Sequence, residues 1–516
     1  MGMMPKVSKR YLPDTAATYS MNARLRSGAL VPFRAETVTK TLATAAGTIL
    51  VVNGSVEGFP AGTSVVPGPT VTDRLYVSGD GAPRVEGSGF SYPLALNAPA
   101  LKPSVALTAG TIDPDNREAV VFAYTWVTSL DEESATSPLS NLIYFTDGTT
   151  ITLSNFATAP TGRAINRKRI YRSVTDVTGS TELFFVAEIP AVQTSFDYTA
   201  DLALQEPIAT RDYNVPVANI DGFTTMPNGI IAGFSGRDLY FCEPYIPHAW
   251  PRKYGLTTDV KIVALVSFGS TLAVLTEGQP YVVSGIHPAN MAMEKVEENL
   301  PCVSAAGVVD LGYAAAYPSN DGLVLISTQG PNLVTRPLFT RDDWQAFNPN
   351  TIVASQFEGR YAFFHDTTEG RRLGFIDLTG EQPYYMLCDT VGLDLAYDIA
   401  TSRMFVLFTD RRSVRLFDSP TGAAKTVTWR SKLFQTGSLV NYGAARVDTE
   451  LPLPPGAAVS LKVYADDALV DTITVPNGIE RLPAGYLADR YEVEITSNTP
   501  VTMVSVAPGV ASLMEG

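Results

Sequence analysis

The sequence predicts an all-β protein assembled from many short strands. Gly 40 and Pro 36 are abundant among the 516 residues, and charged residues make up only 17%. Short runs rich in β-branched and aromatic residues, separated by Gly, Asn, Asp and Pro, are typical of antiparallel strands joined by tight turns. The chain is too long for one ordinary core, so we expect about two to four domains.

Residues 1–35 are predicted to form a basic N-terminal arm. Asp14 is their single acid, and they show no regular apolar period. The arm either drapes over the protein without fixed structure or orders against a partner chain. In the second interpretation the candidate docking residues are Lys6, Lys9, Arg10, Arg24, Arg26 and Arg34.

Residues 36–97 and 98–205 differ in character. The first segment contains strand runs such as "GTILVVNGSVEG" that end in Asn-Gly and Asp-Gly turns. The second contains "REAVVFAYTWVTS", an acidic, Ser-rich turn, and then "GTTITLSNF", "INRKRIYRSV" and "TELFFVAEIP". Several strands within about a hundred residues are typical of a small sandwich. With "IYRS" and "FDYT" near its last strands, this segment resembles a fibronectin III-like domain.

Residues 206–425 contain a loose repeat. The runs "RDLYFCEP", "TLAVLTEGQPYVVSG", "DGLVLIST", "RYAFFHDT" and "RMFVLFTD" recur, each with a turn and often a second run. One small sheet in every roughly 40–50 residues predicts a β-propeller-like core with an open number of blades. If 36–97 supplies the first propeller strands, the sandwich at 98–205 is an insertion, and fewer strand edges are exposed.

Residues 426–516 predict a small C-terminal β-sandwich. "AAVSLKVYADDALVDTITVPNG" and "DRYEVEITSNTPVTMVSVAP" alternate apolar and polar residues and are separated by "RLPAG". The one predicted helix start is "TRDDWQAF", where Thr340 is the cap and Asp342 and Asp343 fall in the first turn.

The charge balance excludes some classes of partner. The net charge is −14, and an acidic chain does not bind nucleic acid by neutralising its phosphates. "MGMMPKVSKRYLP" lacks the apolar run of a signal peptide, and no stretch approaches the roughly 18 apolar residues of a membrane span. We therefore expect a soluble chain made in the cytosol. Three widely spaced cysteines predict buried free thiols in a reducing compartment: Cys242, Cys302 and Cys388.

Motifs for catalysis or metal binding are weak, and we expect no enzyme activity, no metal and no cofactor. "DPDNRE" at 113–118 lacks the Gly and Glu of an EF-hand loop. "SNDGLVLIS" at 319–327 resembles half of a sialidase Asp-box, without its Thr-Trp end or a second copy. A Cys242–His248 pair would have only Glu243 to orient it. The histidines lie far apart in sequence: His248, His287 and His365.

The basic run "RKRIYR" at 167–172 could contact nucleic acid. On a strand, Arg167, Arg169 and Tyr171 share one face, and the intervening side chains point to the other. Because the charges are split between two faces, a structural strand with solvated arginine head groups is favoured.

The run "FCEPYIPHAWPRKYG" at 241–255 combines residue types found in metal sites, thiol nucleophiles and sugar-stacking platforms. Its three prolines fix φ and bias the preceding residues toward extended geometry, which predicts a stiff loop. We expect Tyr245 and Trp250 to bury their rings, Cys242 to point inward, and His248 to form a hydrogen bond inside the loop. The loop would pack on the next blade or face a neighbouring subunit.

Three motifs in residues 237–345 carry a family resemblance: "EPYIPHAWP", "TEGQPYVVSG" and "NLPCVSAAGVVDLGYAAAYPSNDG". Together with the C-terminal "VYADD", "RLPAG" and "EVEI", they are similar to the tail nozzle of short-tailed bacteriophages, also described as a tail tubular or packaged-DNA-stabilising protein. The resemblance covers the chain from about residue 210 onward and is weakest in the first 100 residues. The motif residues, structural or at a subunit interface, are Glu243, Pro244, Tyr245, Pro247, His248, Trp250 and Pro251.

The resemblance implies a homohexameric ring in the virion tail, assembled in the host bacterial cytoplasm. Such a ring lies below the portal and adaptor, meets a needle or plug and tail fibres or spikes, retains packaged DNA and passes it to the host. An acidic wall suits this conduit because it repels phosphates, so DNA passes without specific binding. The basic arm would dock on the adaptor, and deleting residues 1–35 should leave a folded protein that fails to join heads.

Two other functions remain open at this stage. One is a receptor-binding or glycan-processing virion protein built on a propeller, which would need an aromatic cleft with acids. The other is a bacterial propeller scaffold unrelated to phages.

Overall fold

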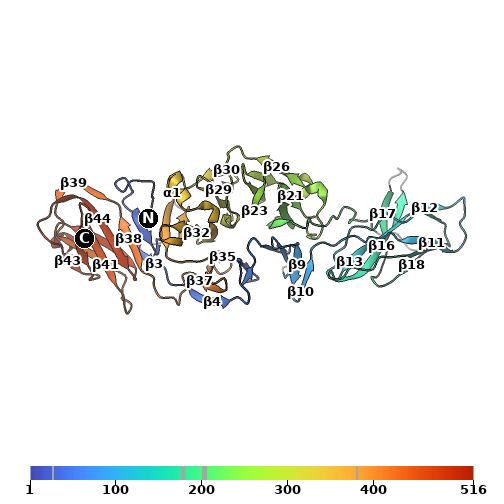
Figure 1. Cartoon of the computed structure of the whole chain (residues 1–516), viewed down its shortest axis with the longest axis horizontal. Coiled ribbons are helices and arrows are strands. Elements are labelled where there is room, and N and C mark those ends of the chain that lie inside the picture. Colours follow the sequence, from blue (N-terminus) through green and yellow to red (C-terminus); the bar gives the residue numbers. More distant parts are fainter. Residues whose placement is uncertain are drawn as a thin grey trace. The chain divides into compact units, whose positions relative to one another are not determined.

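The computed structural model describes residues 2–25, 28–71, 73–175, 181–199, 206–378 and 382–514. This part of the chain contains 45 strands and only two short α-helices, so the predicted all-β class is confirmed (Figure 1). The chain divides into two compact units. Unit 1 comprises residues 1–62, 266–282 and 294–516, and unit 2 comprises residues 63–265 and 283–293.

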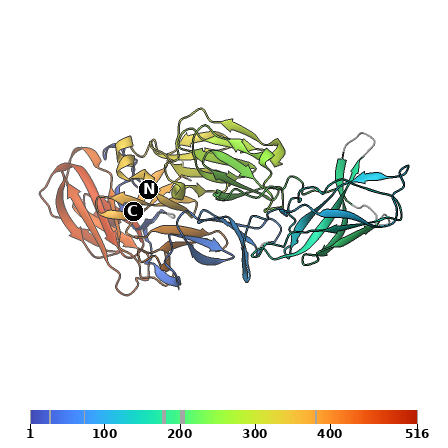
Figure 2. The same cartoon turned by 45° about the vertical axis from the view of Figure 1, so that its right-hand side comes forward.

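The inserted sandwich lies in unit 2 and is drawn in cyan to green (Figure 2). Its main sheets are β11 (Ser104–Ala109), β15 (Thr150–Ser154) and β18 (Phe196–Thr199), and β13 (Phe122–Thr128), β16 (Ile165–Thr175) and β17 (Thr181–Pro190). A third pair joins β12 (Glu118–Val120) to β14 (Ile143–Phe145). Every second residue of β13 from Phe122 to Trp126 is a fully buried aromatic: Phe122, Tyr124 and Trp126. Their rings pack in one core with Ile151 and Tyr198.

Two four-stranded antiparallel sheets complete unit 2. One contains β7 (Ser64–Pro67), β8 (Leu75–Ser78), β9 (Arg84–Gly87) and β10 (Phe90–Pro93). The other contains β19 (Asp221–Met226), β20 (Ile230–Ser235), β21 (Asp238–Phe241) and β22 (Leu256–Thr257). Each is a meander in sequence order, as in a propeller blade. Tyr76 and Val85 share a core with Phe223 and Trp250, so the sandwich interrupts two sheets that pack together.

Unit 1 repeats the same meander. Two of its sheets are β27 (Val309–Asp310), β28 (Ala315–Pro318), β29 (Leu323–Ser327) and β30 (Gly330–Leu333), and β31 (Val353–Phe357), β32 (Arg360–Thr367), β33 (Gly370–Asp377) and β34 (Tyr384–Cys388). A third joins β35 (Asp394–Asp398), β36 (Arg403–Leu407) and β37 (Ser413–Leu416) to β4 (Thr37–Thr41). Strand β4 comes from the N-terminal part of the chain, so the first segment supplies the fourth strand of the last meander, in line with its predicted role.

Another four-stranded sheet contains β23 (Ile262–Phe268), β24 (Thr271–Thr276), β25 (Tyr281–Ser284) and β26 (Ala292–Lys295). Strand β5 (Thr48–Val52) pairs with β6 (Ser55–Phe59). The 3-10 turns are η1 (Arg252–Tyr254), η2 (Pro288–Asn290), η3 (Ala305–Gly307) and η4 (Pro349–Thr351). Helix α1 (Arg341–Ala346) starts where predicted: the Thr340 hydroxyl accepts a hydrogen bond from the Asp343 N–H, and the Asp343 carboxylate accepts one from the Thr340 N–H.

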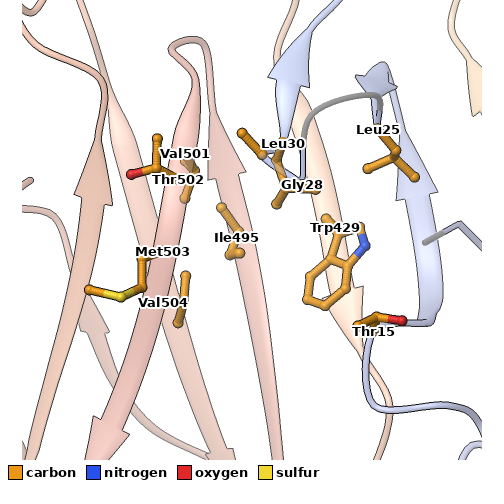
Figure 3. Close-up of a pocket in the computed structure, with 11 residues that line it drawn as sticks. Thr15, Leu25, Gly28, Leu30, Trp429, Ile495, Val501, Thr502, Met503 and Val504 are labelled. Atoms are coloured by element: carbon orange, nitrogen blue, oxygen red, sulfur yellow. The ribbon is translucent and has the colours of Figure 1, made fainter. Parts of the chain in front are cut away.

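The C-terminal sandwich of unit 1 follows, drawn in orange and red (Figure 1). Its elements are β38 (Val427–Ser431), β39 (Phe434–Val440), β40 (Ala444–Thr449), β41 (Val459–Ala465), β42 (Ala468–Ile473), β43 (Ile479–Arg481), β44 (Ala488–Ser497), β45 (Val501–Ala507) and α2 (Val510–Met514). Val447, Leu461 and Ile495 belong to its core. An apolar opening lies beside β45 (Figure 3).

The N-terminal segment differs from the predicted arm, because it is part of the body of unit 1. Strand β1 (Ala17–Met21) pairs in parallel with β34 and antiparallel with β38, and β2 (Ala23–Arg24) pairs with β3 (Val31–Pro32). Met3, Met4 and Leu12 are buried in the core under β32 to β34. The segment therefore covers two strand edges and apolar surface that would otherwise face water.

None of the helices within the described ranges has the length and hydrophobicity needed to cross a lipid bilayer.

Replacing Phe33 tests whether the N-terminal segment is part of the fold. Phe33 is fully buried, with ring centroids 5.5 Å from Phe375 and 5.2 Å from Phe417. We expect Phe33→Ala to lower the free energy of unfolding by about 3–5 kcal/mol in denaturant titrations, as is usual for a buried aromatic. Phe434→Ala, at a 38% exposed ring, is the control and should cost less than about 1 kcal/mol. Equal small losses would show that the segment is detachable.

Candidate functional site

The loop at 241–255 in unit 2 is fixed mainly by its own backbone. The Glu243 N–H donates to the Ala249 carbonyl at 2.8 Å, and the Ile246 N–H donates to the Glu243 carbonyl at 2.9 Å. The Tyr245 N–H donates to the Gly229 carbonyl of the turn between β19 and β20, also at 2.9 Å. These bonds and the prolines hold the loop in a single closed turn.

Cys242 lies directly after β21 and points inward, as predicted. Its sulfur accepts a hydrogen bond from the Ile231 N–H at 3.0 Å, and the side chain is fully buried. Burial raises the pKa of the thiol to about 12, so it stays protonated at neutral pH. A thiolate nucleophile requires the opposite shift. Cys302 and Cys388 are also buried and free, which confirms the prediction of buried thiols.

His248 forms its hydrogen bond outside the loop, which corrects the expectation of an internal bond. The Nε2–H donates to the Glu133 carbonyl in the inserted sandwich at 2.9 Å, because a carbonyl can only accept. Nδ1 lies 3.8 Å from the Glu132 carboxylate and has no hydrogen-bond partner among the residues that the structure describes. Burial lowers the pKa of His248 below its usual value, with a smaller opposing effect from Glu132. The neutral ring thus joins the loop to the sandwich.

Trp250 and Tyr245 differ in burial. Trp250 is 1% exposed, stacks on Phe223 with ring centroids 5.5 Å apart, and donates its indole N–H to the Pro247 carbonyl. This confirms the predicted buried ring. Tyr245 is 53% exposed, so the prediction that its ring is buried is wrong.

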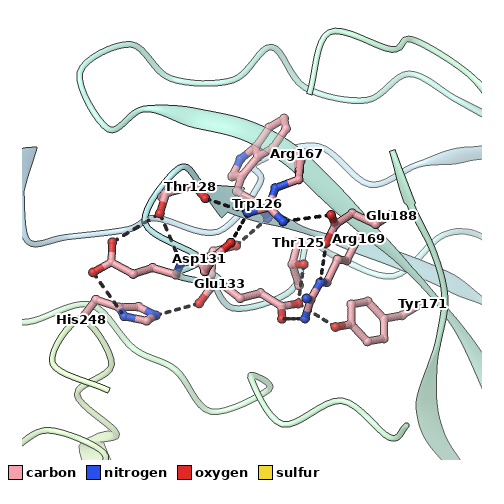
Figure 4. A network of polar contacts seen from close by, with 12 residues as sticks. Thr125, Trp126, Thr128, Asp131, Glu133, Arg167, Arg169, Tyr171, Glu188 and His248 are labelled. Atoms are coloured by element: carbon pink, nitrogen blue, oxygen red, sulfur yellow. Dashed lines mark hydrogen bonds and ion pairs between the residues drawn. The ribbon is translucent and has the colours of Figure 1, made fainter. Parts of the chain in front are cut away.

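The acidic turn after β13 meets the 241–255 loop at His248 (Figure 4). Glu133 receives hydrogen bonds from Thr125, Tyr171 and Arg169, and Arg169 also pairs with Glu188. Its neighbour Glu132 forms a buried ion pair with Arg163 at 2.8 Å. The carboxylates thus fix the turn to the sandwich, and the Glu133 backbone carbonyl is left to accept the hydrogen bond from His248 of the 241–255 loop.

The serines of this turn supply hydrogen-bond partners for the backbone groups at the outer edge of β13. Ser134, Ser137 and Ser140 each accept a hydrogen bond through the side-chain hydroxyl from a β13 N–H. Each also donates its own N–H to the carbonyl of the same β13 residue. The spacing of three between these serines is present in "SATSPLSN", a segment for which the sequence pattern predicts only a turn.

The basic run at 167–172 is neutralised within the sandwich. Arg167 pairs with Asp131 and Glu188 on the face that carries Arg169, as the alternation predicts. On the other face Lys168 is buried, donates to the Gln193 carbonyl at 2.6 Å and lies over the Phe156 ring. Arg167 and Arg169 keep partial contact with solvent, whereas Lys168 and Arg172 are buried, so the expectation of solvated head groups holds for only part of the run. Because the arginines are paired with acids, little charge is left to bind phosphates.

The candidate docking residues of the N-terminal segment are mostly engaged in unit 1. Lys9 forms ion pairs with Glu492 at 2.8 Å and Asp467 at 3.0 Å, and its hydrogen bond to Glu492 raises its pKa. Arg24 pairs with Asp418 and Glu358. The Arg34 guanidinium donates hydrogen bonds to the Pro420 and Gly422 carbonyls, and the Lys6 ammonium donates one to the Arg336 carbonyl. Arg10 is exposed, and Arg26 lies outside the described residues.

The histidines do not converge. His365 is buried against the Tyr385 hydroxyl at 2.6 Å, and burial lowers its pKa to about 4. His287 instead accepts a hydrogen bond from the Ala289 N–H. In "DPDNRE", the Asp113 carboxylate closes a turn by accepting from Asn116 and the Asp115 N–H. Among the residues that the structure describes, no group of three His, Cys, Asp or Glu side chains could hold a metal ion.

No family model and no curated protein matches the sequence. Among solved structures, apo AztD from Citrobacter koseri is 10% identical over 71% of this chain and 100% of its own, with a TM-score of 0.28. PorZ, a surface component of the type IX secretion system of Porphyromonas gingivalis, is 9% identical over 90% and 82%, with a TM-score of 0.27. The dihydro-heme d1 dehydrogenase NirN is 14% identical over 75% and 77%, with a TM-score of 0.26. Likenesses of this size carry no argument about function.

The burial of His248 gives the protein an acid-sensitive contact. As the pH falls through about 6.5, the unfolded chain takes up a proton on this histidine before the folded chain does, so folding free energy is lost. We expect the free energy of unfolding to decrease between pH 7.5 and 5.5, by at most about 1.4 kcal/mol per pH unit for this group. His248→Gln should show a shallower decrease.

His287→Gln, at a 41% exposed histidine, is the matched control for the exchange of histidine for glutamine. Identical slopes for all three proteins would show that His248 does not titrate differently on folding.

Proposed function

We propose that the chain is a structural virion protein, a subunit of the tail nozzle of a short-tailed bacteriophage. The observation that carries the proposal is the run of three family-like motifs in residues 237–345. In this proposal six copies form a ring below the portal and adaptor. The ring retains packaged DNA and passes it to the host at ejection.

The geometry of the 241–255 loop supports a structural role for these motifs. Cys242 and Trp250 are completely or almost completely buried, and His248 serves as a hydrogen-bond donor to the sandwich. The motif "EPYIPHAWP" thus fixes a loop between the β19–β22 sheet and the inserted sandwich, both in unit 2. Catalysis would instead need an accessible nucleophile or base within reach of substrate.

The distribution of charge is compatible with a conduit for DNA. The chain carries a net charge of −14, and the basic run at 167–172 is paired within the sandwich. Anionic walls repel phosphates, and DNA then moves past them without being held. The exposed Arg10 and the N-terminal segment around it remain the candidate contact for the adaptor.

Mass photometry of the purified protein tests the proposal. Six copies of the 55.4 kDa chain give a particle of about 330 kDa, and negative-stain images of it should show sixfold rings. A stable trimer of about 166 kDa that binds glycans would favour the receptor-binding or glycan-processing alternative. A monomer at micromolar concentration that does not join purified phage connectors would contradict the nozzle.

A further inference from the structure

The chain contains three Asn-Gly pairs: Asn53-Gly54, Asn228-Gly229 and Asn477-Gly478. Each asparagine lies in a turn with positive φ, of 49°, 61° and 60° in chain order. Asparagine and glycine suit such turns because both tolerate the left-handed backbone conformation. The second and third pairs even share the tetrapeptide Pro-Asn-Gly-Ile. The pairs thus have similar sequence and backbone, and they differ in what surrounds them.

An Asn-Gly pair is also the sequence most prone to lose its side-chain amide without an enzyme. The glycine backbone nitrogen gives up its proton and attacks the asparagine Cγ, so a new C–N bond forms and Nδ2 leaves as ammonia. Water then adds to either carbonyl of the resulting five-membered succinimide, which opens to aspartate or isoaspartate. One water is consumed and one ammonia is released. Glycine permits the attack because it has no Cβ beside the attacking nitrogen.

The Asn53 side chain is free to reach the attacking nitrogen. It is exposed at the tip of the hairpin formed by β5 and β6 in unit 1. Within the described ranges, its amide group has no hydrogen-bond partner. A Cβ added to Gly54 would meet nothing within 4 Å, so the space around the turn is open. The amide can therefore rotate toward the Gly54 nitrogen without losing a contact.

The Asn228 side chain is restrained in unit 2. Its amide N–H donates a hydrogen bond to the Ile286 carbonyl at 3.0 Å. A Cβ added to Gly229 would come within 2.4 Å of the Tyr245 ring, so this ring covers the turn. Attack at Asn228 therefore requires the loss of one hydrogen bond beside a ring that occupies the space.

The Asn477 side chain is held at both ends of its amide. Its Oδ1 accepts a hydrogen bond from the Thr449 N–H at 2.9 Å, and its Nδ2 donates to the Thr449 hydroxyl at 3.0 Å. The Asn477 N–H also donates to the Val447 carbonyl, so the turn is fixed to strand β40. Attack at Asn477 requires the loss of both side-chain hydrogen bonds.

We propose that Asn53 is a site of spontaneous deamidation in the folded protein, and that their contacts protect Asn228 and Asn477. Breaking one hydrogen bond lowers the population of the free amide about fivefold, and breaking two lowers it about thirtyfold. The expected order of conversion is Asn53, then Asn228, then Asn477. The inference is independent of the proposed function, because it depends only on the local structure of these turns.

The shape of the turn at Asn53 determines the effect of the modification. Asn53 and Gly54 have φ of 49° and 75°, and β5 and β6 pair directly beyond them. Aspartate leaves this backbone unchanged, whereas isoaspartate lengthens it by one carbon and cannot keep the two-residue turn. Further from the tip, the Ile49 N–H donates to the buried Asp394 carboxylate at 2.7 Å. The tip of the hairpin therefore opens in the isoaspartate form, while its base stays in place.

Peptide mapping of the aged protein tests the proposal. The full-length protein is incubated at pH 8 for several weeks, and the replacement of NH2 by OH at each Asn-Gly pair is followed by mass spectrometry. The same protein in urea is the reference. We expect Asn53 to convert about fivefold faster than Asn228 and about thirtyfold faster than Asn477 in the folded protein, and all three to convert at similar rates in urea. Isoaspartate at residue 53 should also speed amide hydrogen exchange of residues 51–56.

Equal rates at the three pairs in the folded protein, or Asn228 or Asn477 converting ahead of Asn53, would overturn the proposal. So would an Asn53 that converts in urea and stays unchanged in the folded protein.

A substitution at Thr449 tests the cause of the protection. Thr449→Val removes the hydroxyl that accepts from Asn477, and it should speed conversion at Asn477 about fivefold while Asn53 keeps its rate. Thr472→Val, at an exposed threonine of the same sandwich, is the matched control and should change neither rate. An Asn477 rate that is the same in both variants would contradict protection by the hydroxyl. Thermal unfolding of each variant verifies that the fold is kept.

Discussion

The hydrogen bond from His248 to the Glu133 carbonyl joins the 241–255 loop to the inserted sandwich, within a network of paired acids in unit 2. Burial lowers the pKa of His248, so the ring makes this bond in its neutral form at neutral pH. The two carboxylates of this turn have other partners. Glu132 forms an ion pair with Arg163, and Glu133 pairs with Arg169 and accepts a hydrogen bond from Tyr171. The turn can therefore remain buried only as a complete network, because removing one partner would leave a charge without compensation.

Unit 1 is organised by a different constraint, the need to cover strand edges. Strand β1 lies between β34 and β38. It thereby joins the β31–β34 meander and strands of the C-terminal sandwich into one continuous sheet. Strand β4 completes the sheet of β35 to β37 in the same way. Both strands come from the first 41 residues. The N-terminal part of the chain thus holds unit 1 together. Lys9 and Arg24 form ion pairs within unit 1, and Lys6 and Arg34 donate hydrogen bonds to its backbone carbonyls.

The short β runs and turn residues were enough to predict the all-β class, and Thr340 with the acids of "TRDDWQAF" was enough to predict the capped helix. The same reasoning failed where long-range partners decide the outcome. Nothing local indicates that Lys9 meets Glu492, or that His248 reaches across to Glu133. Tyr245 was expected to be buried because aromatic rings usually are, but its positive φ turns the side chain outward. The conformation of the loop at Tyr245 depends on a hydrogen bond to Gly229, in the turn between β19 and β20, and local sequence does not show this contact.

The central claim is that the 241–255 motif builds structure and does not present reactive groups. Thiol labelling tests it most directly, since burial holds the pKa of Cys242 at about 12 and keeps reagents away. Native protein at pH 8 is treated with iodoacetamide, and modification of each cysteine is followed by mass spectrometry, with denatured protein as the reference. The account predicts that Cys242 stays unmodified for hours under native conditions and reacts within minutes once the protein is denatured. Rapid modification of Cys242 in the native protein would contradict it.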